Sequence, residues 1–273
     1  MNRHRLIIFT DLDGTLLDHH SYRWDAAAPA LEKLADLEIP VILCTSKTAA
    51  EVAEIHSALG LDTPVIVENG AGIILTPKGA AAGENAHFFG KPYAELITLV
   101  HKIRADKDYC FQGFSDFSVA EVIAATGLEE QAAALARQRL GSEPIIWQDS
   151  PEALARFRQD LAGHNLQLLR GGRFFHILDN RADKGTAVHW LLSYFRQQQP
   201  QPKLFSVALG DGPNDRAMME AVDLAVIIPN PNGIAPEPRC GKILHARQQG
   251  PSGWNRAIHD ILLLYTDKGA EHG

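Results

Sequence analysis

The sequence has few of the features that mark secreted, membrane or nucleic-acid-binding proteins. Only three of its 273 residues are cysteines, Cys44, Cys110 and Cys240, and they stand too far apart to suggest a disulfide framework. This usage favours a reducing compartment, and we expect the cytoplasm. No segment approaches the roughly 18 consecutive apolar residues of a membrane helix, and the apolar run near the N-terminus is too short for a secretory signal.

Positively charged residues are outnumbered, because 26 Lys and Arg stand against 33 Asp and Glu. The formal net charge is −7 and the sequence pI is about 5.9. This balance argues against nucleic acid or an anionic membrane as the main partner, although a local basic pocket could still bind a small anion. Hydrophobic residues make up 45% of the chain and charged residues 22%, so it can bury a core. A chain of this length typically contains about two domains.

The stretch that carries the most chemistry lies near the N-terminus. Residues 6–10 form an apolar run that predicts one buried strand, and Asp11 and Asp13 follow it directly. Alternation places both carboxylates on one side, at the strand end where open α/β sheets bind ligands. At ~4 Å and an effective dielectric of about 20, they would repel each other by about 4 kcal/mol. A cation, a proton or both must offset that repulsion, and Mg²⁺ is the simplest solution. A helix N-cap with a turn is the ordinary alternative.

Apolar runs alternate with helical patterns at both ends of the chain, which is typical of a doubly wound, mostly parallel sheet. Strands are predicted at residues 40–44, 65–67, 203–209 and 224–228, and helices at residues 26–37, 49–59, 184–196 and 254–265. Hairpin chemistry explains the glycines at 70 and 72 better than a nucleotide-binding loop does. Residues 229–238 hold four prolines and predict irregular structure.

The middle of the chain predicts an inserted α+β module. Small and turn-forming residues cluster at 76–83, as in a domain linker. Helices are predicted at residues 93–104, 119–125, 130–139 and 151–161, and strands at residues 144–147, 166–169 and 174–178. Gly171-Gly172 predicts a two-residue hairpin turn. The expected organisation is a core of residues 1–84 and 181–273, with an inserted cap domain of residues 85–180.

Three of the predicted core strands end in polar side chains. Asp11 and Asp13 follow the first strand, Thr45 and Ser46 the second, and Asp211 and Asp215 the strand that ends at residue 209. Parallel neighbours would bring these ends to one edge of the sheet, within reach of Lys184 at a helix start. Phosphoryl transfer needs such a set of nucleophile, metal ligands, hydroxyl and ammonium. Each residue alone has an ordinary explanation as a cap, a turn or a solvated lysine.

Taken in order, these motifs resemble those of the haloacid dehalogenase superfamily of aspartate-dependent phosphatases. Asp11-Leu-Asp-Gly-Thr15 matches the first motif, Thr45 the second, Lys184 the third and Gly210-Asp-Gly-Pro-Asn-Asp215 the fourth. The insertion lies between the second and third motifs, where the larger α/β caps of that superfamily occur. The resemblance therefore implies a Rossmann-like core with an α+β cap.

The resemblance also implies roles for individual residues. Asp11 would be the nucleophile that forms an aspartyl-phosphate, and Asp13 the general acid and base. Mg²⁺ would be held by the Asp11 carboxylate, the Asp13 backbone carbonyl and Asp211, with Asp215 in support. The residues implied to bind the phosphate or the rest of the substrate are Thr45, Ser46, Lys184 and Asn214.

Within the superfamily, the chain is similar to the mannosyl-3-phosphoglycerate phosphatase family. The similarity lies in Thr45-Ser-Lys-Thr48, Glu68-Asn-Gly-Ala71, Gly172-Arg-Phe-Phe-His176 and Gly210-Asp-Gly-Pro-Asn-Asp215. The implied partner is a small phosphorylated sugar-glycerate, and the implied product is a compatible solute. Arg170 or Arg173 would bind the glycerate carboxylate, because an arginine fork pairs with a carboxylate bidentately. The alternatives are a related phosphatase for other sugar phosphates and a non-catalytic phosphosugar-binding protein. The expected state is monomer or homodimer.

Overall fold

The computed structural model describes residues 5–75, 85–200, 202–231 and 234–267, and the predicted linker at 76–83 lies outside them. By the density of internal contacts, the chain divides into two units. Unit 1 comprises residues 1–45 and 184–273, and unit 2 comprises residues 46–183. A division by contact density need not follow folding domains, so the boundaries predicted at 84/85 and 180/181 stay a prediction.

Unit 1 is built on a parallel sheet. Its strands, in spatial order, are β12 (Ile243–His245), β11 (Leu224–Ile227), β10 (Leu204–Gly210), β1 (Arg5–Thr10) and β2 (Val41–Cys44). The central strands are almost continuous apolar runs because helices cover both faces of a sheet of this kind. The last strand, β12, was not predicted, since it is only three residues long and follows the proline-rich segment.

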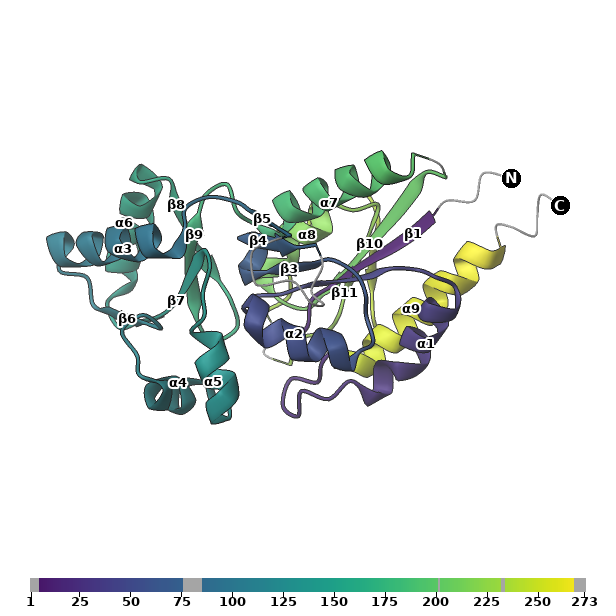
Figure 1. Cartoon of the computed structure of the whole chain (residues 1–273), viewed down its shortest axis with the longest axis horizontal. Coiled ribbons are helices and arrows are strands. Elements are labelled where there is room, and N and C mark those ends of the chain that lie inside the picture. Colours follow the sequence, from purple (N-terminus) through teal and green to yellow (C-terminus); the bar gives the residue numbers. More distant parts are fainter. Residues whose placement is uncertain (1–4, 76–84, 201, 232–233, 268–273) are drawn as a thin grey trace. The chain divides into compact units, whose positions relative to one another are not determined.

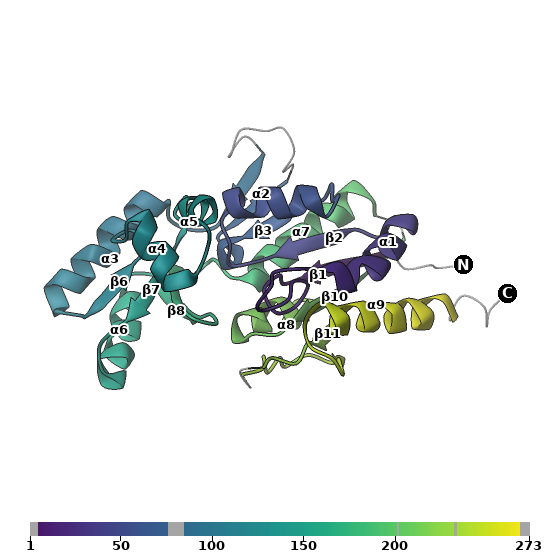
Figure 2. The same ribbon diagram turned by 90° about the horizontal axis from the view of Figure 1, so that it is seen from below.

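Helices lie on both faces of this sheet (Figures 1 and 2). The helices of unit 1 are η1 (Asp25–Ala27), α1 (Ala28–Asp36), α7 (Lys184–Gln198), η3 (Pro213–Asp215), α8 (Arg216–Glu220) and α9 (Gly250–Asp267). Helices α7 and α8 pack together on one face, and α1 and α9 pack together on the other. Helix α9 begins earlier than predicted, and its Trp254 is completely buried.

The first helix of unit 2 is α2 (Ala49–Ala58). A capping box between Thr48 and Glu51 stabilises its N-terminus. Next come β3 (Val65–Val67), η2 (Glu68–Gly70), β4 (Gly72–Ile74) and β5 (Ala86–Phe88). The two pairs β3–β4 and β4–β5 are antiparallel, so the predicted hairpin at residues 70–72 is confirmed.

A separate antiparallel sheet forms the rest of unit 2 (Figure 1). Its spatial order is β6 (Phe111–Gly113), β7 (Ser142–Trp147), β9 (Phe175–Asp179) and β8 (Leu166–Arg170). The accompanying helices are α3 (Tyr93–Lys107), α4 (Val119–Thr126), α5 (Glu130–Ala136) and α6 (Pro151–Gly163). Phe111, Trp147 and Phe157 pack in one core cluster, with Trp147 stacked on both phenylalanines. The predicted fold class, a mostly parallel α/β core with an antiparallel insertion, is confirmed.

Two local predictions in unit 2 are wrong. The turn between β8 and β9 is not a two-residue hairpin, because Arg170 pairs with Phe175 and four residues lie between them. Gly171 N donates to Phe174 O at 3.0 Å, which closes this wider loop. The predicted helix at 130–139 ends at Ala136 instead.

A buried carboxylate explains where the chain turns after α5. Glu68, which is fully buried, accepts hydrogen bonds from the backbone N–H of Leu140, Gly141 and Ser142 at 2.7, 3.1 and 2.9 Å. It also accepts one from the Ser142 hydroxyl at 2.9 Å. These donors fix the loop that precedes β7, and Arg139 Nε lies 3.5 Å from the same carboxylate. No helix in the described ranges is long and apolar enough to cross a membrane.

Candidate active site

Four charged residues meet at the C-terminal edge of the parallel sheet of unit 1. Asp11 directly follows β1, and Asp211 directly follows the neighbouring strand β10. Asp11 N donates to Leu209 O at 2.9 Å, so the ladder between the two strands continues up to the site. Lys184 is the first residue of α7 and Asp215 the last of η3.

Lys184 is the centre of this group. Its Nζ donates to Asp11 Oδ1 and to Asp215 Oδ1, at 2.6 Å each, and its side chain is 0% exposed. Burial by itself lowers the pKa of Lys184, but the charges of Asp11 and Asp215 outweigh it and leave the pKa above its usual value. The ammonium is therefore present at any physiological pH.

Asp215 has both oxygens engaged by the protein. Oδ1 accepts from Lys184, while Oδ2 accepts from the backbone N–H of Asp211 and of Gly212, at 3.0 Å each. The close approach requires glycine at 210, because a Cβ there would lie 2.5 Å from Asp215 Oδ2. Asp215 thus fixes the turn after β10 and anchors Lys184.

Asp11 has one oxygen engaged and one available. Oδ1 accepts from Lys184, and no hydrogen bond from the described residues reaches Oδ2. Two consecutive hydrogen bonds fix its backbone. Trp254 Nε1 donates to Thr10 Oγ1 at 3.0 Å, and Thr10 Oγ1 donates to the Asp11 carbonyl oxygen at 2.8 Å. A carboxylate with a fixed backbone, one anchored oxygen and one available oxygen is the arrangement a carboxylate nucleophile needs.

The cluster carries more negative than positive charge. Asp11, Asp211 and Asp215 each offer a carboxylate oxygen within 4.8 Å of the others, and Lys184 is the one cation bonded to them among the described residues. Burial, and then the charge of Asp215, raise the pKa of Asp11 well above its ordinary value. The same two causes raise the pKa of Asp211 to about 7. Three hard oxygen donors with a deficit of positive charge fit Mg²⁺ well.

We expect Mg²⁺ to stabilise the protein more as pH rises. Because the folded-state pKa of Asp211 is raised to about 7, its contribution to metal-free stability is present at low pH and lost as pH rises through that value. Mg²⁺ binds only the deprotonated carboxylates, and at about 100 times its Kd it adds about 2.7 kcal/mol. Melting curves with EDTA and with Mg²⁺, at about pH 5.5 and about pH 8, measure this. An equal shift at both pH values would contradict the prediction.

The other core residues with predicted roles lie in unit 1. Asp13 is half-buried, and its charge adds to the raised pKa values of Asp11 and Asp211, after burial and the charge of Asp215. Thr45 is buried directly after β2, and Asn214 lies within η3, half-buried.

The remaining predicted residues, Ser46, Arg170 and Arg173, belong to unit 2. Arg173 Nη1 donates to Thr126 O at 2.6 Å. Arg170 ends β8, two and four residues after the core residues Leu168 and Leu166, so alternation places it on the sheet face that α6 covers.

Two polar contacts at the site were not predicted. Thr15 Oγ1 donates to Asp211 Oδ1 at 3.2 Å, and Asn230 Nδ2 donates to Asp211 Oδ2 at 2.8 Å. Thr15 closes the first motif, but the motif itself does not indicate a contact with Asp211. Asn230 stands between two prolines after β11, and nothing in the local sequence pattern marks it as functional.

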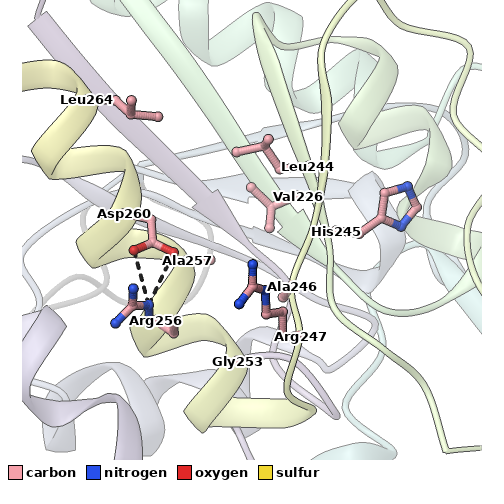
Figure 3. Close-up of a pocket in the computed structure, with 10 residues that line it drawn as sticks. All are labelled: Val226, Leu244, His245, Ala246, Arg247, Gly253, Arg256, Ala257, Asp260 and Leu264. Carbon is pink, nitrogen blue, oxygen red and sulfur yellow. Dashed lines mark hydrogen bonds and ion pairs between the residues drawn. The ribbon is translucent and has the colours of Figure 1, made fainter.

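A surface cavity in unit 1 lies apart from these residues (Figure 3). It lies between β12 and α9 and is lined by Leu244, Arg247, Arg256 and Leu264, among others. The guanidinium of Arg256 pairs with Asp260 in its wall. No residue of the acidic cluster lines this cavity.

The fold and the site define a class of protein: a parallel α/β core that presents a buried aspartate cluster and a lysine at the carboxyl edge of its sheet. The family model for haloacid dehalogenase-like hydrolases matches residues 8–234, and the chain belongs to that family.

Solved structures similar to the chain share its fold at low identity. A phosphatase of the haloalkanoate superfamily from Bacteroides thetaiotaomicron is 18% identical with a TM-score of 0.67, over 94% of this chain and 95% of that one. A haloacid dehalogenase-like hydrolase from B. subtilis is 18% identical with a TM-score of 0.64, over 93% and 98%. The sucrose-phosphatase of Synechocystis, solved with sucrose and phosphate, is 17% identical with a TM-score of 0.63, over 94% and 98%.

Proposed function

We propose that the chain is a Mg²⁺-dependent phosphatase that hydrolyses mannosyl-3-phosphoglycerate to mannosylglycerate and phosphate in the cytoplasm. The observation that carries the phosphatase proposal is the state of Asp11, with one oxygen bonded to Lys184 and the other available for attack. The narrower substrate rests on the sequence resemblance alone. The structures of a haloalkanoate-superfamily phosphatase and of a sucrose-phosphatase, similar in fold, support the reaction class.

The reaction would proceed in two displacements. In the first, Asp11 Oδ2 attacks phosphorus, the bond from phosphorus to the glycerate oxygen breaks, and Asp13 protonates that leaving oxygen. In the second, Asp13 takes a proton from water, the water oxygen attacks phosphorus, and the bond to Asp11 breaks, which releases phosphate. Lys184 keeps Asp11 oriented throughout and offsets part of the phosphate charge.

Asp11, the backbone carbonyl of Asp13 and Asp211 would hold the metal ion, and Asp215 would support them. Bound there, Mg²⁺ supplies positive charge against the phosphoryl oxygens. Thr45 and Lys184 would bind the oxygens of the transferring phosphoryl group, and Ser46 and Asn214 would bind the phosphate or the rest of the substrate.

The decisive experiment is phosphate release from a panel of substrates, with Mg²⁺ and with EDTA. Mannosyl-3-phosphoglycerate, other sugar phosphoglycerates, sucrose phosphate and simple hexose phosphates form the panel. A preference in kcat/KM for the mannosyl compound supports the proposal. A preference for another sugar phosphate would show that this other compound is the substrate. Binding without any phosphate release would indicate a non-catalytic protein, although no nucleophile or acidic ligand is missing. Transfer of the phosphate between positions of the sugar, without release, would indicate a mutase.

Replacement of Arg173 in unit 2 should change KM for a substrate that carries a carboxylate more than KM for one that does not. If Arg173 binds the glycerate carboxylate, Arg173→Ala should raise KM for the glycerate substrate about ten- to a hundredfold, since a charge-assisted hydrogen bond contributes about 1.5–3 kcal/mol. KM for p-nitrophenyl phosphate should hardly change. Arg137→Ala, which removes an exposed arginine from the same unit, is the matched control. Equal KM changes for both substrates would remove Arg173 from the binding site.

A further inference from the structure

The side-chain amide of Asn230 contacts both the carboxylate and the backbone carbonyl of Asp211. Its Nδ2 lies 2.8 Å from Asp211 Oδ2 and 3.3 Å from the Asp211 carbonyl oxygen. Asn230 follows β11 by three residues, while Asp211 follows the neighbouring strand β10. The contact therefore joins two adjacent strand ends at the sheet edge where the acidic cluster lies.

The backbone around Asn230 is restricted. Pro229 precedes it and Pro231 follows it, and a residue before proline is confined to extended conformations. The side chain is half-buried, so it is partly shielded from water. The Asn230 backbone therefore loses little further conformational entropy when its side chain binds Asp211.

The other side of the Asp211 carboxylate is also fixed. Oδ1 accepts from Thr15 Oγ1 at 3.2 Å. Gly14, with φ of +82°, allows the carboxylate to come close, because a Cβ at that position would lie 2.6 Å from Asp211 Oδ2. One donor on each oxygen and a glycine beside them leave the carboxylate a single orientation.

We propose that Asn230 is a positioning residue that fixes the Asp211 carboxylate for the divalent ion and thereby raises the affinity of the site for that ion. The inference rests on the metal site of the proposed function. A ligand that must be immobilised when the ion binds loses conformational entropy at that moment, whereas a ligand already held by Asn230 and Thr15 does not. Partners of metal ligands typically contribute about 10- to 100-fold to metal affinity.

The test measures metal binding without turnover. Free Mn²⁺, monitored by electron paramagnetic resonance, is titrated into the substrate-free wild type, Asn230→Ala and Asn230→Leu. Both variants remove the donor, and the leucine keeps most of the volume in case the alanine variant folds poorly. Each should bind Mn²⁺ about 10- to 100-fold more weakly than the wild type. In activity assays, the Mg²⁺ concentration for half-maximal rate should rise, while kcat at saturating Mg²⁺ stays close to that of the wild type.

The controls separate a positioning role from a structural one. Asn255→Ala removes another asparagine contact in unit 1, the bond that Oδ1 accepts from Ala30 N at 3.0 Å, away from the acidic cluster. It should lower the melting temperature and leave Mn²⁺ affinity unchanged. Unchanged Mn²⁺ affinity in both Asn230 variants would overturn the positioning role alone. A wild type that binds Mn²⁺ no more tightly than Asp211→Ala would overturn the metal site itself, and with it the proposed function.

Discussion

Asp11→Asn is expected to reduce phosphate release by about 10³-fold or more, because an amide oxygen cannot form the aspartyl-phosphate. The fold should survive, since an asparagine Oδ1 can still accept the hydrogen bond from Lys184 that the carboxylate accepts at 2.6 Å. The measurement is steady-state phosphate release with circular dichroism as the check on folding. Acid-quenched wild type should also carry a phosphoryl group that the variant lacks.

Two further variants make this result specific. Asp13→Asn should lose more rate on a sugar phosphate than on p-nitrophenyl phosphate, whose leaving group needs less protonation. Asp36→Asn removes an exposed carboxylate of α1 and should leave all rates unchanged. Substantial turnover by Asp11→Asn with either substrate would show that another group attacks phosphorus.

Lys184→Met is expected to destabilise the protein by about 3–5 kcal/mol near neutral pH, the usual cost of removing one partner from a buried ion pair. Methionine matches the volume of lysine, so the loss reflects the two carboxylates left without their ammonium. The penalty should shrink as pH falls, because burial, and then the charge of Asp215, raise the pKa of Asp11 above its ordinary value, and protonation of Asp11 removes part of the uncompensated charge. Urea unfolding at several pH values measures the effect.

The control for this prediction is Lys203→Met, which replaces an exposed lysine just before β10. It should change the free energy of unfolding by less than about 0.5 kcal/mol at every pH. Mg²⁺ should recover part of the stability lost in Lys184→Met, since the ion also offsets carboxylate repulsion. A penalty for Lys184→Met that does not depend on pH would indicate a packing defect rather than unpaired charge.

The sequence predicts the strand ends that meet at the site because two simple rules apply there. Apolar runs mark buried strands, and parallel strands bring their carboxyl ends to one edge, so Asp11 and Asp211 were expected to be neighbours. The contact from Asn230 obeys no such rule, because it depends on how a proline-rich segment returns to the sheet. Glu68 contacts Leu140, Gly141 and Ser142, which follow it by 72 to 74 positions in the chain. Local sequence patterns cannot predict contacts between residues so far apart.

Local patterns were also misleading where tertiary contacts decide the outcome. Gly171-Gly172 is typical of a two-residue turn, yet the register of β8 against β9 leaves four residues in the loop. The helical pattern at 130–139 continues beyond Ala136, but the chain leaves the helix and binds the carboxylate of Glu68 at Leu140 instead. Short β12 lacks any periodicity long enough to detect.

The hydrogen bond from Trp254 to Thr10 spans 244 positions of the chain. During synthesis, β1 leaves the ribosome first, but its partner β10 and the tryptophan that supports Thr10 emerge only near the end. The antiparallel sheet of β6, β7, β9 and β8 has a core cluster of its own with α3 and α6, so it can form before β10 is translated. Nascent chains that stop short of α9 should therefore contain this folded sheet and remain catalytically silent.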